Sequence, residues 1–149
     1  QNPSDSYQLL FTSRLYEFLY HLCRSYSHQI PSASLTGSQR DLQRVTHVMN
    51  WVKVHYPEPL SLETAADSLA LSKEYFCRLF KKYTGQTFLE YLNDVRTMHL
   101  YEDLQNSDET ITVLMEKNGL SNYKIFMRTF KKLYGSTPQK MRSNRIRHV

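Results

Sequence analysis

A basic segment occurs twice in this chain of 149 residues, once at 78–85 and again at 128–135. Arg, Phe, Lys, Lys and Gly stand at the same offsets in RLFKKYTG and RTFKKLYG. The chain has only four glycines, and Gly commonly ends a helix because it adopts the left-handed conformation easily. The repeat therefore predicts one helical unit that is built twice, and this duplication limits the possible folds more than any other feature.

Apolar residues recur at three- and four-residue spacing along the whole chain, and strand-like alternation is scarce, which predicts an all-α fold. The N-terminal region 1–26 is expected to form an amphipathic helix, because its large apolar residues share one helical face. The run SHQIPSASLTGS, with Pro, Gly and many Ser, predicts a linker over 27–40. Further helices are expected at 39–56, about 61–70, 72–83, 87–104, 110–117, 121–134 and 138–142.

Two pairs of these helices have the layout of a helix-turn-helix. Ser61 and Ser72 are suited to cap the helices of the first pair, and the small Ala65 allows them to cross closely. Asn118-Gly119 predicts the turn of the second pair. We therefore expect a domain at 41–149, with lobe one at 41–85, a linker helix at 87–104 and lobe two at 110–143.

Each repeated helix is expected to have an apolar face and a charged face. The residues expected to point into the core are Phe76, Leu79, Phe80, Tyr83, Phe126, Phe130 and Leu133. The residues expected on the exposed faces are Glu74, Cys77, Arg78, Lys81, Lys124, Met127, Arg128 and Lys131. In the linker helix the expected inward positions are Phe88, Tyr91, Leu92, Val95 and Met98.

Positive charge is concentrated on the same repeated helices. The net charge is +5 and the sequence pI is about 9.2, with cationic clusters at 72–83 and 121–132. Such clustering is typical of nucleic-acid-binding proteins. A solvated surface has no reason to repeat its charges in register with the core aromatic residues, so we favour a DNA-binding function. An exposed helical face about 10 Å wide also suits the ~12 Å major groove of duplex DNA.

Side-chain chemistry suggests how these residues contact DNA. Arg78 and Arg128 can make bidentate hydrogen bonds to guanine, and Glu74 can accept one from cytosine. Met127 or Ile125 can contact thymine methyl groups. Phosphate contacts are expected from Lys81, Lys82, Lys131 and Lys132. A phosphate at a helix N-terminus can be held by backbone N–H groups together with Ser72 and Ser121.

Several other classes of function have little support in the sequence. Cys23 and Cys77 lack the spacing of a disulfide framework or a zinc site, which fits a reducing cytoplasm. The six histidines show no metal-ligand spacing, so we expect no metal, no cofactor and no enzymatic activity. No apolar run approaches the ~20 residues of a membrane span, and no membrane partner is expected. Because the chain begins at Gln1 without Met, we expect an upstream domain.

The stretches LSLETAADSLALSKEYFCRLFKKYTGQTFLEYLNDVR and ITVLMEKNGLSNYKIFMRTFKKLYGSTPQKMR resemble the DNA-binding domain of bacterial AraC/XylS-family transcription regulators, over about 41–143. The family's signature order is present in Gly119, Ser121, Phe126, Arg128, Phe130, Lys131, Gly135, Pro138 and Arg142. The resemblance implies two homeodomain-like helix-turn-helix lobes whose recognition helices enter successive major grooves. It implies base reading by Glu74, Cys77 and Arg78 in lobe one, and by Tyr123, Lys124 and Arg128 in lobe two.

The residues expected to bind DNA are therefore Ser72, Lys73, Glu74, Cys77, Arg78, Lys81, Lys82, Ser121, Asn122, Tyr123, Lys124, Met127, Arg128, Lys131 and Lys132. Three residues depart from the family pattern. Met115 and Leu100 stand where a small Ala is usual, and Leu120 replaces the usual Phe. We expect these larger or altered side chains to affect the packing angle of lobe two.

The resemblance also implies an N-terminal sensing and dimerisation domain, with 5–26 as its last helix and a candidate contact in a homodimer. The implied function is that of a sequence-specific transcription regulator, most readily an activator, which binds double-stranded promoter DNA and contacts RNA polymerase. Two alternatives stay open. One is a basic helical module that binds acidic proteins. The other is a nucleic-acid repair protein that uses Cys77 as a nucleophile, although the sequence shows no activating base for it.

Overall fold

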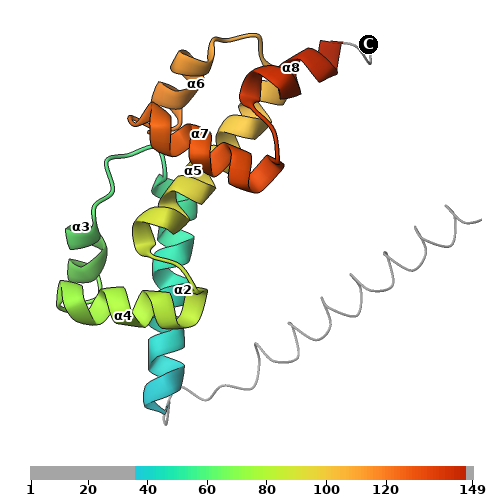
Figure 1. Ribbon diagram of the computed structural model, residues 1–149. Helices are drawn as coiled ribbons and strands as arrows, with labels where there is room; N and C mark the ends of the chain where they lie inside the picture. Colours follow the sequence, from blue (N-terminus) through green and yellow to red (C-terminus); the bar gives the residue numbers. More distant parts are fainter. Residues whose placement is uncertain (1–35, 147–149) are drawn as a thin grey trace, which may run out of the picture. The chain divides into compact units, whose positions relative to one another are not determined.

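The computed structural model describes residues 36–146, with side chains through Ser143. Every regular element in this range is a helix, so the predicted all-α fold is confirmed. The helices are α2 (Gly37–His55), α3 (Leu62–Asp67), α4 (Lys73–Thr84), α5 (Phe88–Asn106), α6 (Ile111–Lys117), α7 (Tyr123–Tyr134) and α8 (Pro138–Ile146) (Figure 1). The amphipathic helix predicted at 1–26, and most of the predicted linker, lie outside the described residues.

The first described helix begins earlier than the sequence suggested. We expected Gly37 to belong to the linker, but α2 starts there. The carbonyl of Thr36 accepts hydrogen bonds from the backbone N–H groups of Gln39 and Arg40, and the Gln39 side chain accepts one from the Thr36 backbone. These bonds close a first helical turn in spite of the glycine, because they satisfy N–H groups that a helix start leaves open.

Lobe one consists of α2, α3 and α4 around one hydrophobic cluster. Ser61 caps α3 as predicted, because its side chain accepts from the backbone N–H of Thr64 and Thr64 reciprocates. The helix stops at Asp67 rather than near Ala70, which has a φ of 52° and lies in the turn. The cluster contains Val45, Val48, Val52, Ala65, Ala66, Phe76, Leu79, Phe80, Phe88, Tyr91, Leu92 and Val95.

Helices α4 and α7, which carry the repeated segment, match in length and in the way they end. Each has 12 residues, and each is followed by a glycine in the left-handed region, with a φ of 77° at Gly85 and 67° at Gly135. A side chain with a Cβ is strained there, so the predicted role of both glycines as helix ends is confirmed.

The two helices differ from one another at their N-termini. Ser72 caps α4 as predicted, and its side chain accepts a hydrogen bond from the backbone N–H of Tyr75. In α7 the cap is Asn122, whose Oδ1 accepts from the backbone N–H of Ile125 at 3.0 Å. The prediction that α7 starts at Ser121 is therefore wrong, because the Asn122 side chain takes the capping position and the helix begins one residue after it.

Helix α5 connects the lobes and contributes to both cores. Thr87 and Glu90 form a capping box at its start. Its N-terminal half packs into the lobe-one cluster, and Leu100 and Leu104 belong to a second cluster. The helix reaches Asn106 rather than 104, because the backbone continues until Ser107 caps it through the Asp103 carbonyl. Met98, expected to point inward, is 51% exposed, so that prediction is wrong.

Lobe two consists of α6, α7 and α8 around the second cluster. Its buried residues are Leu100, Leu104, Leu114, Met115, Leu120, Phe126 and Phe130. The three departures from the family pattern thus all lie in this core, where they contribute apolar volume. Leu133, expected to point inward, is 37% exposed, so that prediction is wrong. Arg142 anchors α8 by donating to the Glu109 carbonyl oxygen at 2.6 Å.

The two lobes meet where the α2–α3 connection approaches the turn between α6 and α7. Arg96 on α5 donates from Nε to the Tyr56 carbonyl oxygen at 2.7 Å and from Nη2 to the Glu58 carbonyl oxygen at 2.6 Å. Gly119 lies against Pro57, and a Cβ added to Gly119 would be 2.6 Å from the Pro57 carbonyl oxygen. Only a glycine fits this approach without a shift of neighbouring atoms.

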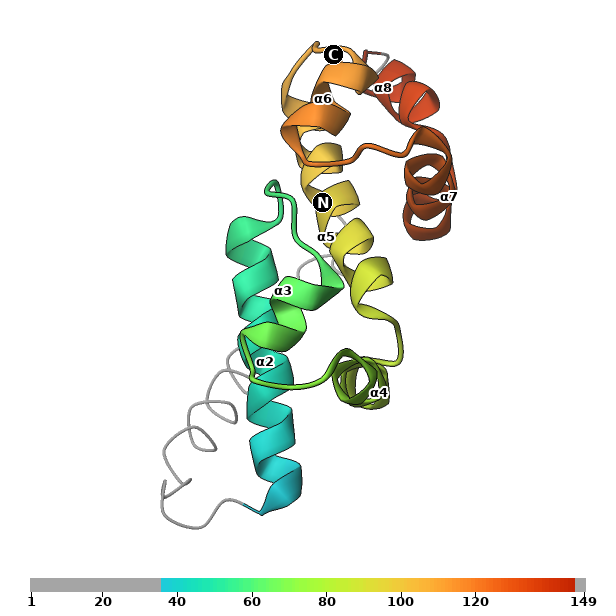
Figure 2. The ribbon, with the colours of Figure 1, turned by 90° about the vertical axis from the view of Figure 1, so that its left-hand side faces the viewer.

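The arrangement of α5 places both repeated helices on one side. In Figure 1, α7 crosses in front of α5, and α4 crosses in front of α2 below it. After the 90° turn of Figure 2, α4 and α7 are both seen nearly end-on and lie on the same side. The two views agree that α4 and α7 run in similar directions along one face of the unit formed by Asp41–Val149.

Candidate nucleic-acid interface

The outer face of α4 carries the side chains predicted from the sequence. Glu74, Cys77, Arg78 and Lys81 are all exposed, whereas Phe76 is completely buried on the opposite face. The buried Phe76 packs against Phe80 and Phe88 with ring centroids 5.6 and 5.7 Å away. Aromatic packing behind the helix thus holds its charged face outward, as the predicted division of faces required.

One predicted DNA-binding residue of lobe one is already paired within the protein. Lys73 Nζ lies 2.7 Å from Glu63 Oε1, and both side chains are half-exposed. Hydrogen bonding to Glu63 raises the pKa of Lys73, and the same bond from Lys73 lowers the pKa of Glu63. Lys73 therefore keeps its charge, but part of its field is cancelled by Glu63. A phosphate would have to compete with Glu63 for Lys73.

The outer face of α7 has similar chemistry with more exposed aromatic surface. Lys124, Arg128 and Lys131 are exposed, and Tyr123 at the helix start is 52% exposed. Met127, expected on the outer face, is only partly exposed and packs against the lobe-two core. It therefore presents little surface for a contact with thymine.

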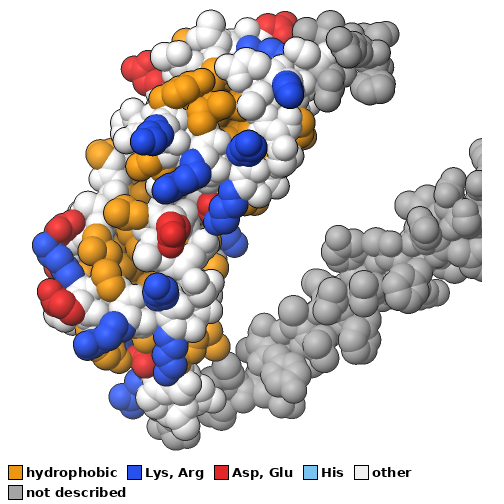
Figure 3. Space-filling model, in the orientation of Figure 1, with side chains coloured by type: hydrophobic (Ala, Val, Ile, Leu, Met, Phe, Trp, Pro, Cys, Tyr) orange, Lys and Arg blue, Asp and Glu red, His pale blue; other side chains and the backbone are white. Residues whose placement is uncertain are grey.

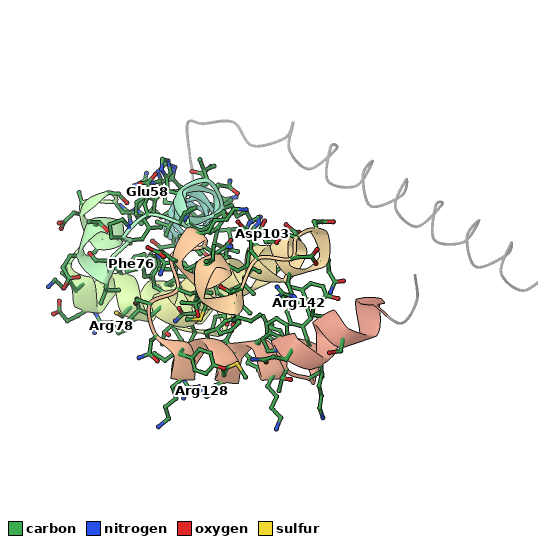
Figure 4. The ribbon with its side chains drawn as sticks, turned by 90° about the horizontal axis from the view of Figure 1, so that it is seen from above. Glu58, Phe76, Arg78, Asp103, Arg128 and Arg142 are labelled. Atoms are coloured by element: carbon green, nitrogen blue, oxygen red, sulfur yellow. The ribbon has the colours of Figure 1, made fainter. Side chains whose placement is uncertain are left out.

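Arg78 and Arg128 occupy equivalent positions on their helices, and their side chains can contact a partner outside the domain. Each is the sixth residue of its helix. Neither makes an ion pair or side-chain hydrogen bond with another residue of the described range 36–146. Seen from above, Arg78 and Arg128 lie along one edge of the domain, whereas Glu58 lies on the opposite edge (Figure 4). The two guanidinium groups are thus available to the same external partner.

The surface between the two helices contains acidic groups as well as lysines. Lys132 on α7 pairs with Asp94 on α5, with 3.3 Å between Nζ and Oδ2. Hydrogen bonds from the backbone and side chain of Thr87 hold the pKa of Glu90 below its ordinary value, and the charges of Lys132 and Lys81 act in the same direction. Lys132 was predicted as a phosphate contact, and a phosphate would have to compete with Asp94 for it. Asp94 and Glu90 are acidic residues of this surface that the sequence analysis did not single out.

The sequence held a signal for one of these two. The T-x-x-E pattern of Thr87 and Glu90 is typical of a capping box, and it would have placed Glu90 at the start of α5. Nothing in the local sequence connects Asp94 with Lys132, because the two residues meet only once α7 packs on α5.

The groups at the N-termini of α4 and α7 that could bind a phosphate differ from those predicted. The side-chain oxygens of Ser72 and Asn122 are engaged as caps, so a phosphate would be bound by the remaining free N–H groups of each first turn. Ser121 is exposed and precedes the cap, outside the helix. The prediction that Ser121 belongs to the N-terminus of α7 is therefore wrong.

Cationic side chains gather on the face that carries both helices. Figure 3 shows Lys and Arg side chains over α7 and over α4, with hydrophobic and acidic side chains between the two regions. We define the basic face as the exposed residues Arg78, Lys81, Lys82, Lys124, Arg128, Lys131 and Lys132. A surface of this kind attracts a polyanion through its field and through release of counterions.

Other kinds of site have no support in the described part of the chain. Cys77 is a free, exposed thiol, and none of the described residues forms a hydrogen bond with it that could activate it. Residues 36–146 contain no group of three or more His, Cys, Asp or Glu side chains placed to hold a metal ion. None of the helices described is long and apolar enough to span a bilayer.

The fold and the basic face define a helix-turn-helix DNA-binding protein. A family model described as a helix-turn-helix domain matches residues 65–144, which include most of both lobes. A structure of an AraC-type DNA-binding domain protein from Chromobacterium violaceum is 28% identical, with a TM-score of 0.59 over 73% of this chain and 95% of that one. The chain belongs to the AraC family of helix-turn-helix transcriptional regulators.

Curated relatives and a DNA complex agree with this assignment. The transcriptional activator RhaS of Escherichia fergusonii is 31% identical over 111 residues, covering 74% of this chain and 40% of RhaS. An uncharacterized HTH-type regulator of Staphylococcus aureus is 33% identical over 102 residues, covering 68% of this chain. The DNA-binding domain of AdpA, solved with a target DNA, is 25% identical with a TM-score of 0.61, covering 68% of this chain and 91% of that domain. The chain thus spans 14% to 40% of these curated relatives' length.

Proposed function

We propose that this chain reads two successive major grooves of promoter DNA, with α4 in one groove and α7 in the next, and that it acts in transcription activation. The observation that carries this proposal is the placement of Arg78 and Arg128. They occupy the same position of two equally long helices, lie along one edge of the domain and make no internal ion pair among the described residues. On one side of a duplex the major groove returns after ~34 Å.

Each part of the basic face has a distinct role in this proposal. Arg78 and Arg128 read guanine through bidentate hydrogen bonds, and each good pair discriminates against a wrong base by ~1–3 kcal/mol. Glu74, Cys77, Tyr123 and Lys124 flank them near the helix starts, where side chains of a recognition helix reach base edges. Lys81, Lys82 and Lys131 lie in the last turns and contact phosphates, which adds affinity without reading sequence.

The activating role is supported by the relatives rather than by the site. RhaS is named as a transcriptional activator, and this chain resembles a part of it. We extend the same role to this chain, with RNA polymerase as the protein partner. A homodimer through residues 5–26 or an upstream domain, and residence in the bacterial cytoplasm, belong to the same proposal.

A binding titration tests the base-reading role of Arg128. The chain's preferred duplex is first selected from a random pool, and the affinity for it and for a scrambled duplex is then measured across salt concentrations. Arg128→Lys keeps the charge but loses the bidentate fork, so it should lower the affinity for the selected duplex about 5- to 100-fold and leave the scrambled duplex almost unaffected. Lys53→Ala removes a charge from exposed α2 and serves as the control.

A footprint tests the two-groove arrangement itself. Protection of two major-groove segments about one turn apart on one side of the duplex is the expected result. If Arg128→Lys weakened both duplexes equally and the footprint covered one groove only, base reading by α7 would be ruled out. Weak affinity for every duplex, together with retention of an acidic protein partner by the Arg78 and Arg128 variants, would instead favour a protein-interaction module.

A further inference from the structure

We infer that Arg96 is a positioning residue that sets the spacing between the two recognition helices. This inference rests on the proposed two-groove function and adds to it the element that determines which half-site separation is accepted. Arg96 is on α5, directly after Val95 of the lobe-one core and before the segment that enters the lobe-two core. It touches no part of the basic face, so its effect on DNA binding would be indirect.

The contacts of Arg96 join the two lobes. Nε and Nη2 donate to the carbonyl oxygens of Tyr56 and Glu58, at 2.7 and 2.6 Å, and hold the α2–α3 connection of lobe one on the middle of α5. The Nε atom also lies 3.1 Å from the place where a Cβ of Gly119 would be. Arg96 is therefore hydrogen-bonded to a turn of lobe one and packed against a turn of lobe two.

The contact between those two turns is itself close. A Cβ on Gly119 would be 2.6 Å from the Pro57 carbonyl oxygen and 3.1 Å from the Pro57 carbonyl carbon. Pro57 lies between Tyr56 and Glu58, the two residues whose carbonyl groups Arg96 binds. Release of these carbonyls would free the Pro57 peptide to move away from Gly119, and the turn that leads into α7 would lose a support.

The ring of Tyr56, which stacks on that of His99 of α5 with centroids 4.1 Å apart, also belongs to this junction. An open cleft of about 810 Å³ adjoins it, and its walls include Pro59, Leu60, Arg96, Met115, Gly119 and Tyr123. The lobes therefore do not pack against each other across this cleft. The Arg96 bonds and the contact of Pro57 with Gly119 restrain the lobes where the cleft begins. Since Tyr123 is the first residue of α7 and also lines the cleft, a change at the junction is transmitted directly to a recognition helix.

A lysine cannot replace Arg96 in this role. The planar guanidinium group presents Nε and Nη2 in a rigid fork, and this fork matches the two carbonyl oxygens at the ends of the Tyr56-Pro57-Glu58 segment. A lysine ammonium group is a single centre on a flexible stem, so it cannot hold both carbonyls with the same geometry. Arg96→Lys thus preserves the charge while removing the specific restraint.

The experiment measures the affinity of the whole chain for duplexes that differ only in spacing. The selected duplex is compared with versions that carry one or two extra base pairs between the half-sites, each of which moves the second half-site by ~3.4 Å and rotates it. The proteins are the unaltered chain, Arg96→Ala, Arg96→Lys and the control Lys53→Ala. Thermal unfolding of each protein establishes that the variants are folded at the assay temperature.

The unaltered chain should lose about 10-fold or more in affinity for each inserted duplex, because simultaneous engagement of linked modules commonly contributes a factor of 10²–10⁴. Arg96→Ala should reduce this spacing penalty to about 2- to 3-fold while binding the selected duplex more weakly, and Arg96→Lys should lie between the two. A merely structural role would lower stability but leave the preferred spacing unchanged.

The outcomes separate the two proposals. If folded Arg96→Lys and Arg96→Ala kept the full spacing penalty of the unaltered chain, the positioning role of Arg96 would be overturned while two-groove reading survived. If the unaltered chain itself bound all spacings equally, two-groove reading would fail, and the role of Arg96 would fail with it. Should Arg96→Ala not fold, the result with Arg96→Lys decides the question alone.

Discussion

The Pro57 carbonyl oxygen occupies the place next to Gly119 that a side chain would need. A Cβ on Gly119 would approach that oxygen to 2.6 Å, and the backbone of Gly119 has a φ of 73°. Two independent costs therefore oppose any other residue at this position, namely backbone strain and a clash with backbone of the other lobe. Gly85 has a φ of 77° but open space around it, which makes it a natural comparison.

Gly119→Ala should therefore destabilise the domain more than Gly85→Ala. The left-handed conformation costs a non-glycine residue ~1–2 kcal/mol, and both variants bear that cost. The clash with Pro57 should add roughly 1–3 kcal/mol for Gly119→Ala alone, in the range of overpacking. Urea unfolding of the two variants measures the difference. Equal losses would show that the Pro57 carbonyl moves away without cost.

Phe130→Ala should lower the free energy of unfolding by ~3–5 kcal/mol, because Phe130 is completely buried in the lobe-two core and the substitution leaves a cavity. Leu133→Ala, three residues later on the same helix, is the matched control. Leu133 is 37% exposed, so its loss should cost much less than 2 kcal/mol. If both variants lost the same free energy of unfolding, Leu133 would be buried in the core, as the sequence predicted.

Asn122→Ala should destabilise the domain by ~0.5–2 kcal/mol, since it removes the side chain that caps α7. Ser121→Ala should change stability by no more than about 0.5 kcal/mol, because Ser121 is exposed and lies outside the helix. Thermal unfolding at several scan rates distinguishes the two. A larger effect of Ser121→Ala would contradict the assignment of Asn122 as the cap of α7.

Asp94→Asn should strengthen binding to selected and scrambled duplexes alike. The substitution frees Lys132 from its internal ion pair and removes a negative charge near the basic face. One additional phosphate contact should steepen the dependence of log affinity on log salt by about 0.9. Asp67→Asn, at an exposed position of α3, controls for the change in net charge. An unchanged slope would show that Lys132 does not reach the phosphates.

The network around Asp103 should make stability depend on pH in the acid range. Burial raises the pKa of Asp103, but hydrogen bonds from Asn118 and Lys117 outweigh this effect, so the pKa in the folded state is lowered. A lowered pKa of this carboxyl adds stability at pH values above its ordinary pKa in the unfolded chain. This stability is lost as the pH falls through the pKa of the folded state. Asp103→Asn should therefore be less stable than the unaltered chain at neutral pH, with the difference shrinking at acid pH in urea titrations.

The sequence predicted the elements well because most of its signals were local. The caps at Ser61 and Ser72, the stops at Gly85 and Gly135 and the turn at Gly119 each depend on chemistry within a few residues. Amphipathic spacing also separated the buried Phe76 and Phe126 from the exposed Arg78 and Arg128. These features brought the predicted recognition helices to the surface with the expected side chains outward.

The predictions that were wrong concern residues whose exposure or partner depends on packing between distant parts of the sequence. Met98 and Leu133 follow the apolar spacing of their helices, yet their side chains are 51% and 37% exposed. Met127 is partly buried because the lobe-two core extends further around α7 than the spacing indicates. The partners of Lys73 and Lys132 could not be inferred either, because Glu63 and Asp94 meet these lysines only through the packing of separate helices.

Helix α5 gives one more consequence, since it serves the two cores with different stretches of a single uninterrupted helix. One residue inserted between Val95 and Leu100 would turn everything downstream by ~100° and advance it by ~1.5 Å. Lobe two would still find its own core residues, but α7 would swing out of line with α4. The number of residues in this stretch therefore sets the rotation of α7 relative to α4. Insertions or deletions there should be tolerated far less than substitutions of side chains.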